Sequence, residues 1–339
     1  EPPLIELSES NPSGTIFTPV LDAKIDKNKN LIYCSTFQLA WNQLAHDVIK
    51  DTVEIKEAPD YVSKLNSMIN LPPCVSEDAY IAIAGLIKDN VINKTKKLLS
   101  EKFGENLFDL IGRQNFDSKD IIAFSYLFKN LPFEKIFEKI NGHIMEFDGK
   151  KSVVKAFGIE KDKQLEKLVN VVCFNYKNND QFIITLKTKS NTDEVVISTI
   201  PPEETLEKTY IKIRNYFGYF EKNVDSADHF TCRTAGRGLF LAIPKIDFNI
   251  RYHFDKMNNK KILNKNFEKY FITASMQGIR FKMNEKGVVL KSYSFLDCTM
   301  GEHLTLIVKG PFLVYLKDKN HNKPYFMAYI GNDELLVKN

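Results

Sequence analysis

The sequence predicts a single-domain α+β protein. Helical patterns dominate the N-terminal part of the 339-residue chain, whereas from Gly238 onward almost every segment has the pattern of a strand. Hydrophobic residues make up 43% and charged residues 27%, which suits a large buried core. Helices followed by runs of strands are typical of α+β folds rather than of doubly wound α/β folds. We therefore expect N-terminal helices packed on large, mainly antiparallel sheets formed mostly by the C-terminal half.

The first thirty residues differ in composition from the rest. Residues 1–30 hold Pro–polar turns and end in the charged run Asp26 to Asn30, so we expect a partly ordered leader. No Gly/Ser run, Pro-rich tract or charge block divides residues 31–339, which we interpret as one domain. Since Glu1 is not a Met, a removed leader peptide is also consistent with the chain.

Apolar residues at helical spacing predict four helices. Ser35 or Thr36 suits the N-cap of the first helix, and Gly104 suits the end of the third. The predicted helices run from Leu31 to Ile49, from Tyr61 to Ile69, from Ala79 to Ile92 with a continuation from Asn93 to Phe103, and from Glu203 to Phe217.

Strand patterns follow in the middle and dominate the end of the chain. The β-branched and aromatic run from Asp120 to Phe128 indicates a strand buried on both faces. The other predicted strands are 167–176, 181–188 and 194–200, then 239–243, 247–254, 272–283, 288–295, 304–308, 312–317 and 324–330.

Charge, cysteine usage and hydropathy restrict the partners. A net charge of +4, from 47 basic and 43 acidic residues, is too even for a nucleic-acid-binding surface. No apolar run is long enough to span a membrane, and the five scattered cysteines predict reduced, mostly buried thiols. We expect a monomer that is secreted or held at the cell envelope, with a cytoplasmic protein as the alternative.

The sequence contains none of the common enzyme motifs. It holds no P-loop, dinucleotide fingerprint, H-E-x-x-H or G-x-S-x-G. His229 and Cys232 are too few ligands for zinc, and Cys298 with His303 forms the one candidate nucleophile pair, within a single short segment. We therefore predict a protein that is not an enzyme and has no cofactor and no metal site.

Four motifs in the C-terminal third occur in an order that resembles the serpins, the serine protease inhibitor family. They run from Ile243 to Phe248, from Asn284 to Val288, from Gly310 to Leu316 and from Tyr325 to Gly331. The chain is similar to a divergent, bacterial-type serpin, and the likeness covers about two-thirds of it. Ala123 to Phe137 and Val172 to Leu186 match two further serpin segments.

The resemblance implies which residues carry the function. The motif Asn-Glu-x-Gly marks the hinge of a bait loop, which in the family inserts as an extra strand after a protease cuts it. The implied hinge residues are Glu285, Gly287, Val288 and Leu290, and the implied reactive-loop residues are Ser294, Cys298, Met300, Gly301 and Glu302, with the cut near Met300-Gly301.

The residues after the hinge argue against efficient inhibition. If this stretch inserted, Val288 and Leu290 would point into the core, while Val289 and Lys291 would point outward. Leu290 is bulky where the family uses Ala, so insertion is expected to be slow. An ordinary strand in a permanently filled sheet is the favoured alternative for residues 288–295.

These patterns favour two functions over a third, an enzyme acting through Cys298 and His303, which ranks last. One is a serpin-like protein that meets a protease or another protein through the loop after the hinge, with doubtful inhibitory activity. The other is a non-inhibitory module that binds a ligand or a cell-surface partner on the same fold.

Overall fold

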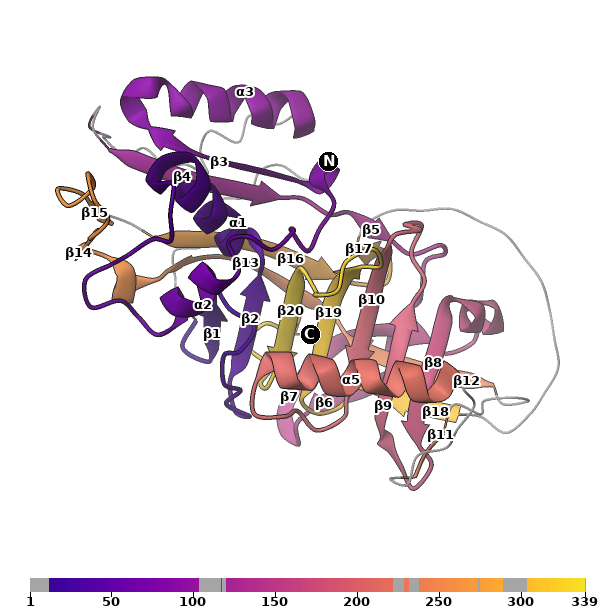
Figure 1. Cartoon of the computed structure of the whole chain (residues 1–339). Helices are drawn as coiled ribbons and strands as arrows, with labels where there is room; N and C mark the ends of the chain where they lie inside the picture. The colour runs from indigo at the N-terminus through magenta and orange to yellow at the C-terminus, as the bar shows by residue number, and fades with distance from the viewer. Residues whose placement is uncertain are drawn as a thin grey trace. The chain divides into compact units, whose positions relative to one another are not determined.

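The computed structural model describes residues 12–103, 117, 120–221, 229–231, 238–272, 275–288 and 304–338. The chain forms two compact units, drawn in Figure 1. Unit 1 comprises residues 1–11, 34–129 and 249–280, and unit 2 comprises residues 12–33, 130–248 and 281–339.

Unit 2 is built around an eight-stranded sheet in the order β1-β2-β20-β19-β10-β9-β8-β11. β1 pairs in parallel with β2, and the pairs from β20 to β11 are antiparallel. The strands are β1 (Thr15–Thr18), β2 (Asn30–Cys34), β8 (Val169–Asn175), β9 (Asn178–Leu186), β10 (Asp193–Ser198), β11 (Phe230–Thr231), β19 (Phe312–Asp318) and β20 (Phe326–Ile330).

One face of this sheet is covered by helix α5 (Leu206–Glu221), as Figure 1 shows. Leu206, Tyr210 and Ile213 lie on its inner side and join the buried cluster that includes Tyr315 and Tyr329 of the sheet. The spacing of three and four residues places these side chains on one helix face, which explains why the helix lies flat on the strands.

A second sheet of unit 2 has four strands in the order β18-β12-β7-β6. β6 (Glu138–Phe147) and β7 (Lys150–Ile159) form a hairpin, β12 (Leu239–Pro244) runs antiparallel to β7, and β18 (Leu304–Ile307) runs parallel to β12. A separate short pair joins β5 (Leu131–Pro132) to β17 (Gly287–Val288). This pair directly follows the turn that the resemblance identifies as a hinge.

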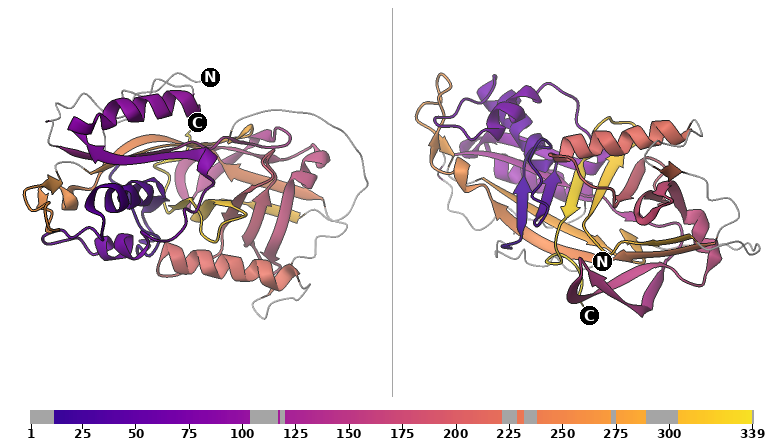
Figure 2. Two further views of the ribbon diagram at one scale, coloured as in Figure 1. Left: turned by 45° about the horizontal axis from the view of Figure 1, so that its top comes forward. Right: turned by 90° about the horizontal axis from the view of Figure 1, so that it is seen from below.

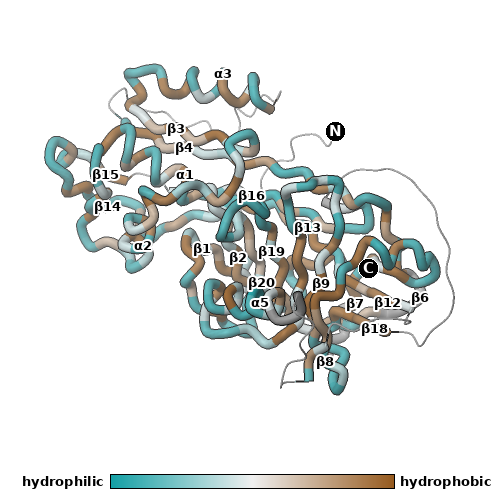
Figure 3. The backbone as a smooth tube through the Cα atoms, turned by 45° about the vertical axis from the view of Figure 1, so that its right-hand side comes forward, coloured by the Kyte–Doolittle hydropathy of each residue, from teal (hydrophilic) through white to brown (hydrophobic). Residues whose placement is uncertain are grey.

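Unit 1 contains helix α1 (Thr36–Gln43), a π-helical turn (Leu44–Ile49), helix α2 (Tyr61–Ser67) and helix α3 (Val91–Phe103). α3 lies along the antiparallel pair β3 (Tyr80–Leu86) and β4 (Ile121–Leu127), as the left view of Figure 2 shows. Leu99 and Ile81 are the buried centre of that packing. Figure 3 shows the alternation of hydrophilic and hydrophobic residues along α3, as expected for a helix with one covered face.

Two further pairs complete the described elements. β13 (Ile246–His253) pairs with β16 (Met276–Met283), and each of these strands has residues in both units. β14 (Lys260–Lys261) pairs with β15 (Phe271–Ile272) in unit 1. No helix among the described residues is long and apolar enough to cross a bilayer.

The predicted α+β class is confirmed, with helices and several sheets in the expected mixture. The helix predicted over Ala79–Ile92 is wrong, because Tyr80–Leu86 forms β3 in a seven-residue ladder with β4. Leu31 to Cys34 likewise belongs to β2 rather than to the first helix. β4 is a strand as predicted, but all its residues are half-buried, so it is not covered on both faces.

The leader prediction falls partly outside the described residues, which begin at residue 12. Of the remainder of that segment, Thr15–Thr18 forms β1, and Phe17 is buried against the sheet. The assignment of residues 31–339 to one domain stays a prediction.

Candidate functional site

The predicted hinge forms a tight turn at the end of β16. The Asn284 N–H donates to the Gly287 carbonyl at 3.3 Å, and the Gly287 N–H donates back to the Asn284 carbonyl at 3.1 Å. The Asn284 side-chain oxygen also accepts from the Lys286 N–H at 3.0 Å. The motif Asn-Glu-Lys-Gly is therefore a self-contained turn that reverses the chain.

Gly287 is required by this turn. Its φ is +116°, a left-handed conformation that other residues rarely adopt. A Cβ here would stand 2.5 Å from the Phe133 nitrogen and 2.8 Å from the Pro132 Cα. Backbone thus approaches backbone closely, and this contact lets Gly287 and Val288 pair with Pro132 and Leu131 as the strand pair β17–β5.

Glu285 is buried within the same turn, with 6% of its surface exposed. Its carboxylate forms an ion pair with Lys245 Nζ at 2.5 Å, and Lys139 Nζ lies 3.9 Å away. Its carbonyl accepts from the Phe137 N–H at 2.8 Å. Burial alone would raise the pKa of Glu285, but the hydrogen bond from Lys245 and the charges of both lysines outweigh it, and the pKa lies below its ordinary value.

Two motifs quoted from the sequence are thus joined by one ion pair. Lys245 lies between β12 and β13, in the motif Ile-Pro-Lys-Ile, and Glu285 lies in the hinge motif. Sequence reasoning singled out both motifs but did not predict their contact. Lys245 is the residue of this candidate site that sequence reasoning did not single out, and a lone charge within an otherwise apolar motif was the available signal.

Most of the predicted reactive loop lies outside the described residues. This applies to Leu290, Ser294, Cys298, Met300, Gly301 and Glu302, as well as to the Cys298–His303 pair. The backbone of Val288 is described, whereas its side chain is not. The structure resumes with β18, which belongs to the four-stranded sheet, so residues 289–303 connect β17 to a different sheet. The roles assigned to all these residues stay predictions.

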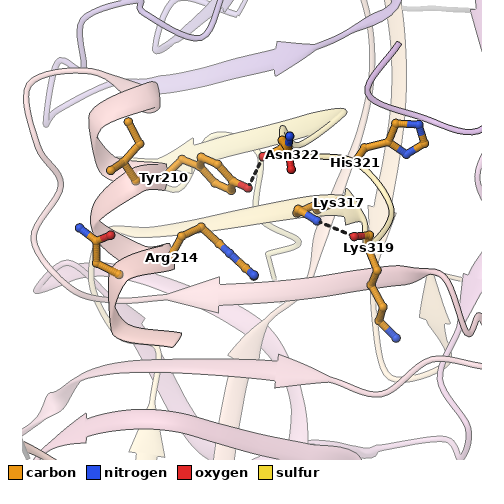
Figure 4. A pocket seen from close by; sticks show the side chains of 8 residues that line it. Tyr210, Arg214, Lys317, Lys319, His321 and Asn322 are labelled. Atoms are coloured by element: carbon orange, nitrogen blue, oxygen red, sulfur yellow. Dashed lines mark hydrogen bonds between the residues drawn. The ribbon is translucent and has the colours of Figure 1, made fainter. Parts of the chain in front are cut away.

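A pocket of about 370 Å³ lies elsewhere in unit 2, between α5 and the end of β19 (Figure 4). Its cationic lining was not predicted, although the spacing Lys317-x-Lys319-x-His321 could have drawn attention to it. α5 contributes Tyr210, Ile211, Arg214 and Asn215, and the β19 side contributes Lys317, Lys319, His321 and Asn322.

The pocket is held by polar contacts. The Tyr210 hydroxyl donates to the Asn322 carbonyl at 2.7 Å, and Lys317 Nζ donates to the Asp318 carbonyl at 2.9 Å. Arg214 pairs with Glu194 at 3.1 Å, which neutralises part of its charge. Burial lowers the pKa of Lys317, because it disfavours the charged ammonium. A bound anion would stabilise that ammonium, so the pocket favours an anionic ligand.

Among the residues that the structure describes, no group of three or more His, Cys, Asp or Glu could hold a metal ion. Of the described cysteines, Cys34 and Cys173 are buried and Cys74 is half-buried. Cys232 and Cys298 lie outside the described residues, so the state of all five thiols stays a prediction.

No protein-family model and no curated protein matches the sequence. Among solved structures, the chain is similar to Arabidopsis AtSerpin1 in its native stressed conformation, at 9% identity and a TM-score of 0.51, covering 91% of this chain and 93% of that one. Matches of lower TM-score, 0.48 each, include Serpin48 of the insect Tenebrio molitor, at 12% identity over 89% and 92% of the two chains, and uncleaved ovalbumin, at 10% over 90% and 94%.

At this level of identity, the likeness to AtSerpin1 concerns the fold alone. It extends over nine-tenths of the chain. It agrees with the α+β architecture described above and with the resemblance found in the sequence. We conclude that this chain has the serpin fold.

Proposed function

We propose that this chain binds a protease or another protein through the loop that follows the hinge, around Ser294 to Glu302, and that it inhibits poorly or not at all. The observation that carries the proposal is the turn at Glu285 to Gly287, which delivers the chain into a strand pair with β5. A segment that leaves such a pair can continue as an added strand, which is one of the ways in which proteins take up peptides. The proposed role is binding rather than catalysis.

The loop has the reach that an exposed bait segment needs. Residues 289–303 link β17 to β18, and fifteen residues can span up to about 50 Å when extended. Leu290 is the obstacle to rapid insertion, because overpacking a core position costs about 1–3 kcal/mol. A partner outside the cell suits this proposal, and we keep secretion or envelope attachment as the expected location.

Limited proteolysis tests the proposal. We expect a cut within residues 294–302, followed by a rise in the melting temperature as the freed segment adds to a sheet. Replacing Leu290→Ala should speed that rise, while the matched change Lys291→Ala, on the opposite face, should leave its rate unchanged. If the loop resists cleavage, or if the cut chain is less stable than the intact one, the bait role is wrong.

The pocket favours a second function, the binding of a small anionic ligand. Lys319 and His321 line it together with Tyr210, so a ligand with one acidic group and one ring would find both charge and an aromatic contact. We expect an anilinonaphthalene sulfonate dye to bind there and Lys319→Ala to weaken its binding, whereas Lys187→Ala, an exposed lysine on unit 2, should not. If the parent chain and both variants bind the dye equally well, the pocket is not its binding site.

A further inference from the structure

The short hairpin of unit 1 forms a small sheet with an earlier segment of the chain. Lys261 pairs with Phe271 across β14 and β15, and the Ile262 N–H donates to the Tyr270 carbonyl at 3.0 Å. On its other side the hairpin contacts residues 54–56. There the Lys56 N–H donates to the Lys261 carbonyl and the Leu263 N–H donates to the Glu54 carbonyl, both at 2.8 Å. Three segments therefore run side by side.

Side chains alternate across this small sheet as they do in any strand. Ile55 and Ile262 face inward and are 6% and 3% exposed. The opposite face carries two apolar residues, Leu263 at 45% exposure and Phe271 at 54%. Lys261 shares that outer face, because it lies two residues from Leu263 and pairs with Phe271. The exposed residues Glu54 and Lys56 of the neighbouring segment lie on the same face by alternation, and Lys269 is an exposed residue of the turn just before Phe271. We call Lys261, Leu263, Lys269 and Phe271 the hairpin face.

The exposure of these apolar residues is not a consequence of loose structure. Asn264 is buried and ties the hairpin down, since its side chain donates to the Thr52 carbonyl and accepts from the Glu54 N–H, each at 2.8 Å. The tip consists of two successive turns, closed by hydrogen bonds from Phe267 to the Asn264 carbonyl and from Tyr270 to the Phe267 carbonyl, both at 2.9 Å. The face is thus preorganised for a partner.

The charge of this segment is positive. Residues 255–272 contain five lysines and two acidic residues. Lys260 is paired with Glu57 at 3.1 Å, whereas Lys261 and Lys269 form no ion pair with any described residue. Figure 1 shows the β14–β15 hairpin at an edge of unit 1. The exposed fractions of Leu263 and Phe271 show that these two apolar side chains are accessible to a partner.

We propose that the hairpin face docks onto an anionic lipid bilayer. Lysines at such a surface are attracted by acidic headgroups, while an aromatic and an aliphatic side chain enter the boundary between headgroups and acyl chains. One Phe and one Leu are far too few for a stable protein interface, which buries roughly 800 Å² on each partner. Shallow insertion into a bilayer needs only a few such side chains. A bilayer is therefore the partner that fits this face.

Sedimentation of the full-length chain with vesicles tests this proposal. We expect it to bind vesicles of phosphatidylcholine with phosphatidylserine, to bind phosphatidylcholine alone far more weakly, and to be released by salt. Lys261→Ser with Lys269→Ser should lower partitioning roughly twenty-fold, and Phe271→Ser should lower it roughly tenfold. The matched controls are Lys88→Ser with Lys94→Ser, which removes the same charge elsewhere on unit 1, and Leu71→Ser, which removes a leucine that is 51% exposed.

Insertion itself can be read from a tryptophan. Phe271→Trp should shift its fluorescence to the blue on vesicles and be quenched by brominated lipid, whereas Trp41, which is buried, should not respond. Thermal melting verifies that each variant is folded. The proposal is overturned if the parent chain ignores acidic vesicles, if the hairpin variants bind as well as the parent, or if the control variants lose as much binding as they do.

Discussion

Glu285 is a buried carboxylate whose charge is balanced by Lys245. Replacing Glu285→Gln leaves the lysine without its counter-charge, so we expect a loss of about 3 kcal/mol in the free energy of unfolding. Urea denaturation at neutral pH measures this difference. As a control, Glu57→Gln breaks an exposed ion pair with Lys260 that solvent screens, so the midpoint of its urea denaturation should match that of the parent.

The same pair predicts a dependence on pH. The pKa of Glu285 is lower in the folded chain than its ordinary value, which is about 4.3 in an unfolded chain. Its contribution is therefore complete above that unfolded value and is lost as the pH falls through the folded one. The stability gap between the parent and Glu285→Gln should close as the medium is acidified from pH 6. A gap that stays constant would mean that the charge of Glu285 is unimportant.

Gly287 gives a second test at this scale. Gly287→Ala places a methyl group against the Phe133 backbone in a left-handed conformation, and we expect it to cost about 2–3 kcal/mol. Gly218→Ala, in helix α5 with nothing within 4 Å of the added carbon, should instead be neutral or slightly stabilising. Thermal denaturation of the two variants makes the comparison.

The sequence located Glu285 and Gly287 because a short motif carried them. It could not reveal Lys245 as the partner, since the two residues are brought together only by the strand pair β13–β16 and the turn that follows it. Local pattern predicts a turn, whereas a contact between distant segments depends on the whole topology. Whether these residues act as a hinge remains a prediction.

Among the elements, the part of β16 that belongs to unit 1 is tied to the start of α1 through Gln277. Its side-chain N–H groups donate to the Cys34 carbonyl at 3.0 Å and to the Thr36 hydroxyl at 2.7 Å, and Ser125 of β4 donates to the Thr36 carbonyl. Gln277→Leu would leave buried acceptors unpaired, at a cost of about 1–3 kcal/mol. Lys282→Leu, a partly exposed position on the same strand, should cost less than about 1 kcal/mol in the same urea titration.

The helices and strands that were predicted correctly are those with the clearest local pattern of apolar residues. α2, α3 and α5 have clear apolar stripes and were located, as were β8, β9 and β10. The segment Tyr80–Leu86 is rich in Ala, Ile and Leu, which suit a helix, but its pairing with β4 prevails. The hairpin β6–β7 was not predicted, although Asp148-Gly149, with φ of 55° and 65°, is the turn that joins it.

At the scale of the molecule, β13 and β16 each contain residues of both units. We therefore expect the units to unfold in one cooperative transition. The fluorescence of Trp41 reports on unit 1, and alkylation of Cys173, followed by mass spectrometry, reports on unit 2, because both side chains are buried. Midpoints that differ in denaturant concentration would contradict this expectation.

The α+β class could be predicted because helical patterns precede a long run of strand patterns, and the serpin resemblance rests on the order of four motifs in the C-terminal third. The motifs could not fix the state of residues 289–303, since the same alternation suits an inserted strand and an exposed loop.

The position of β19 and β20 inside the eight-stranded sheet has one more consequence. Both strands follow residue 303 in the chain, and each has neighbours on its two sides, β10 and β2 among them. A polypeptide nicked between residues 294 and 302 would keep its short C-terminal peptide as an integral part of the core. Such a molecule would elute from a sizing column at the volume of the intact protein, and its two pieces would separate only in detergent.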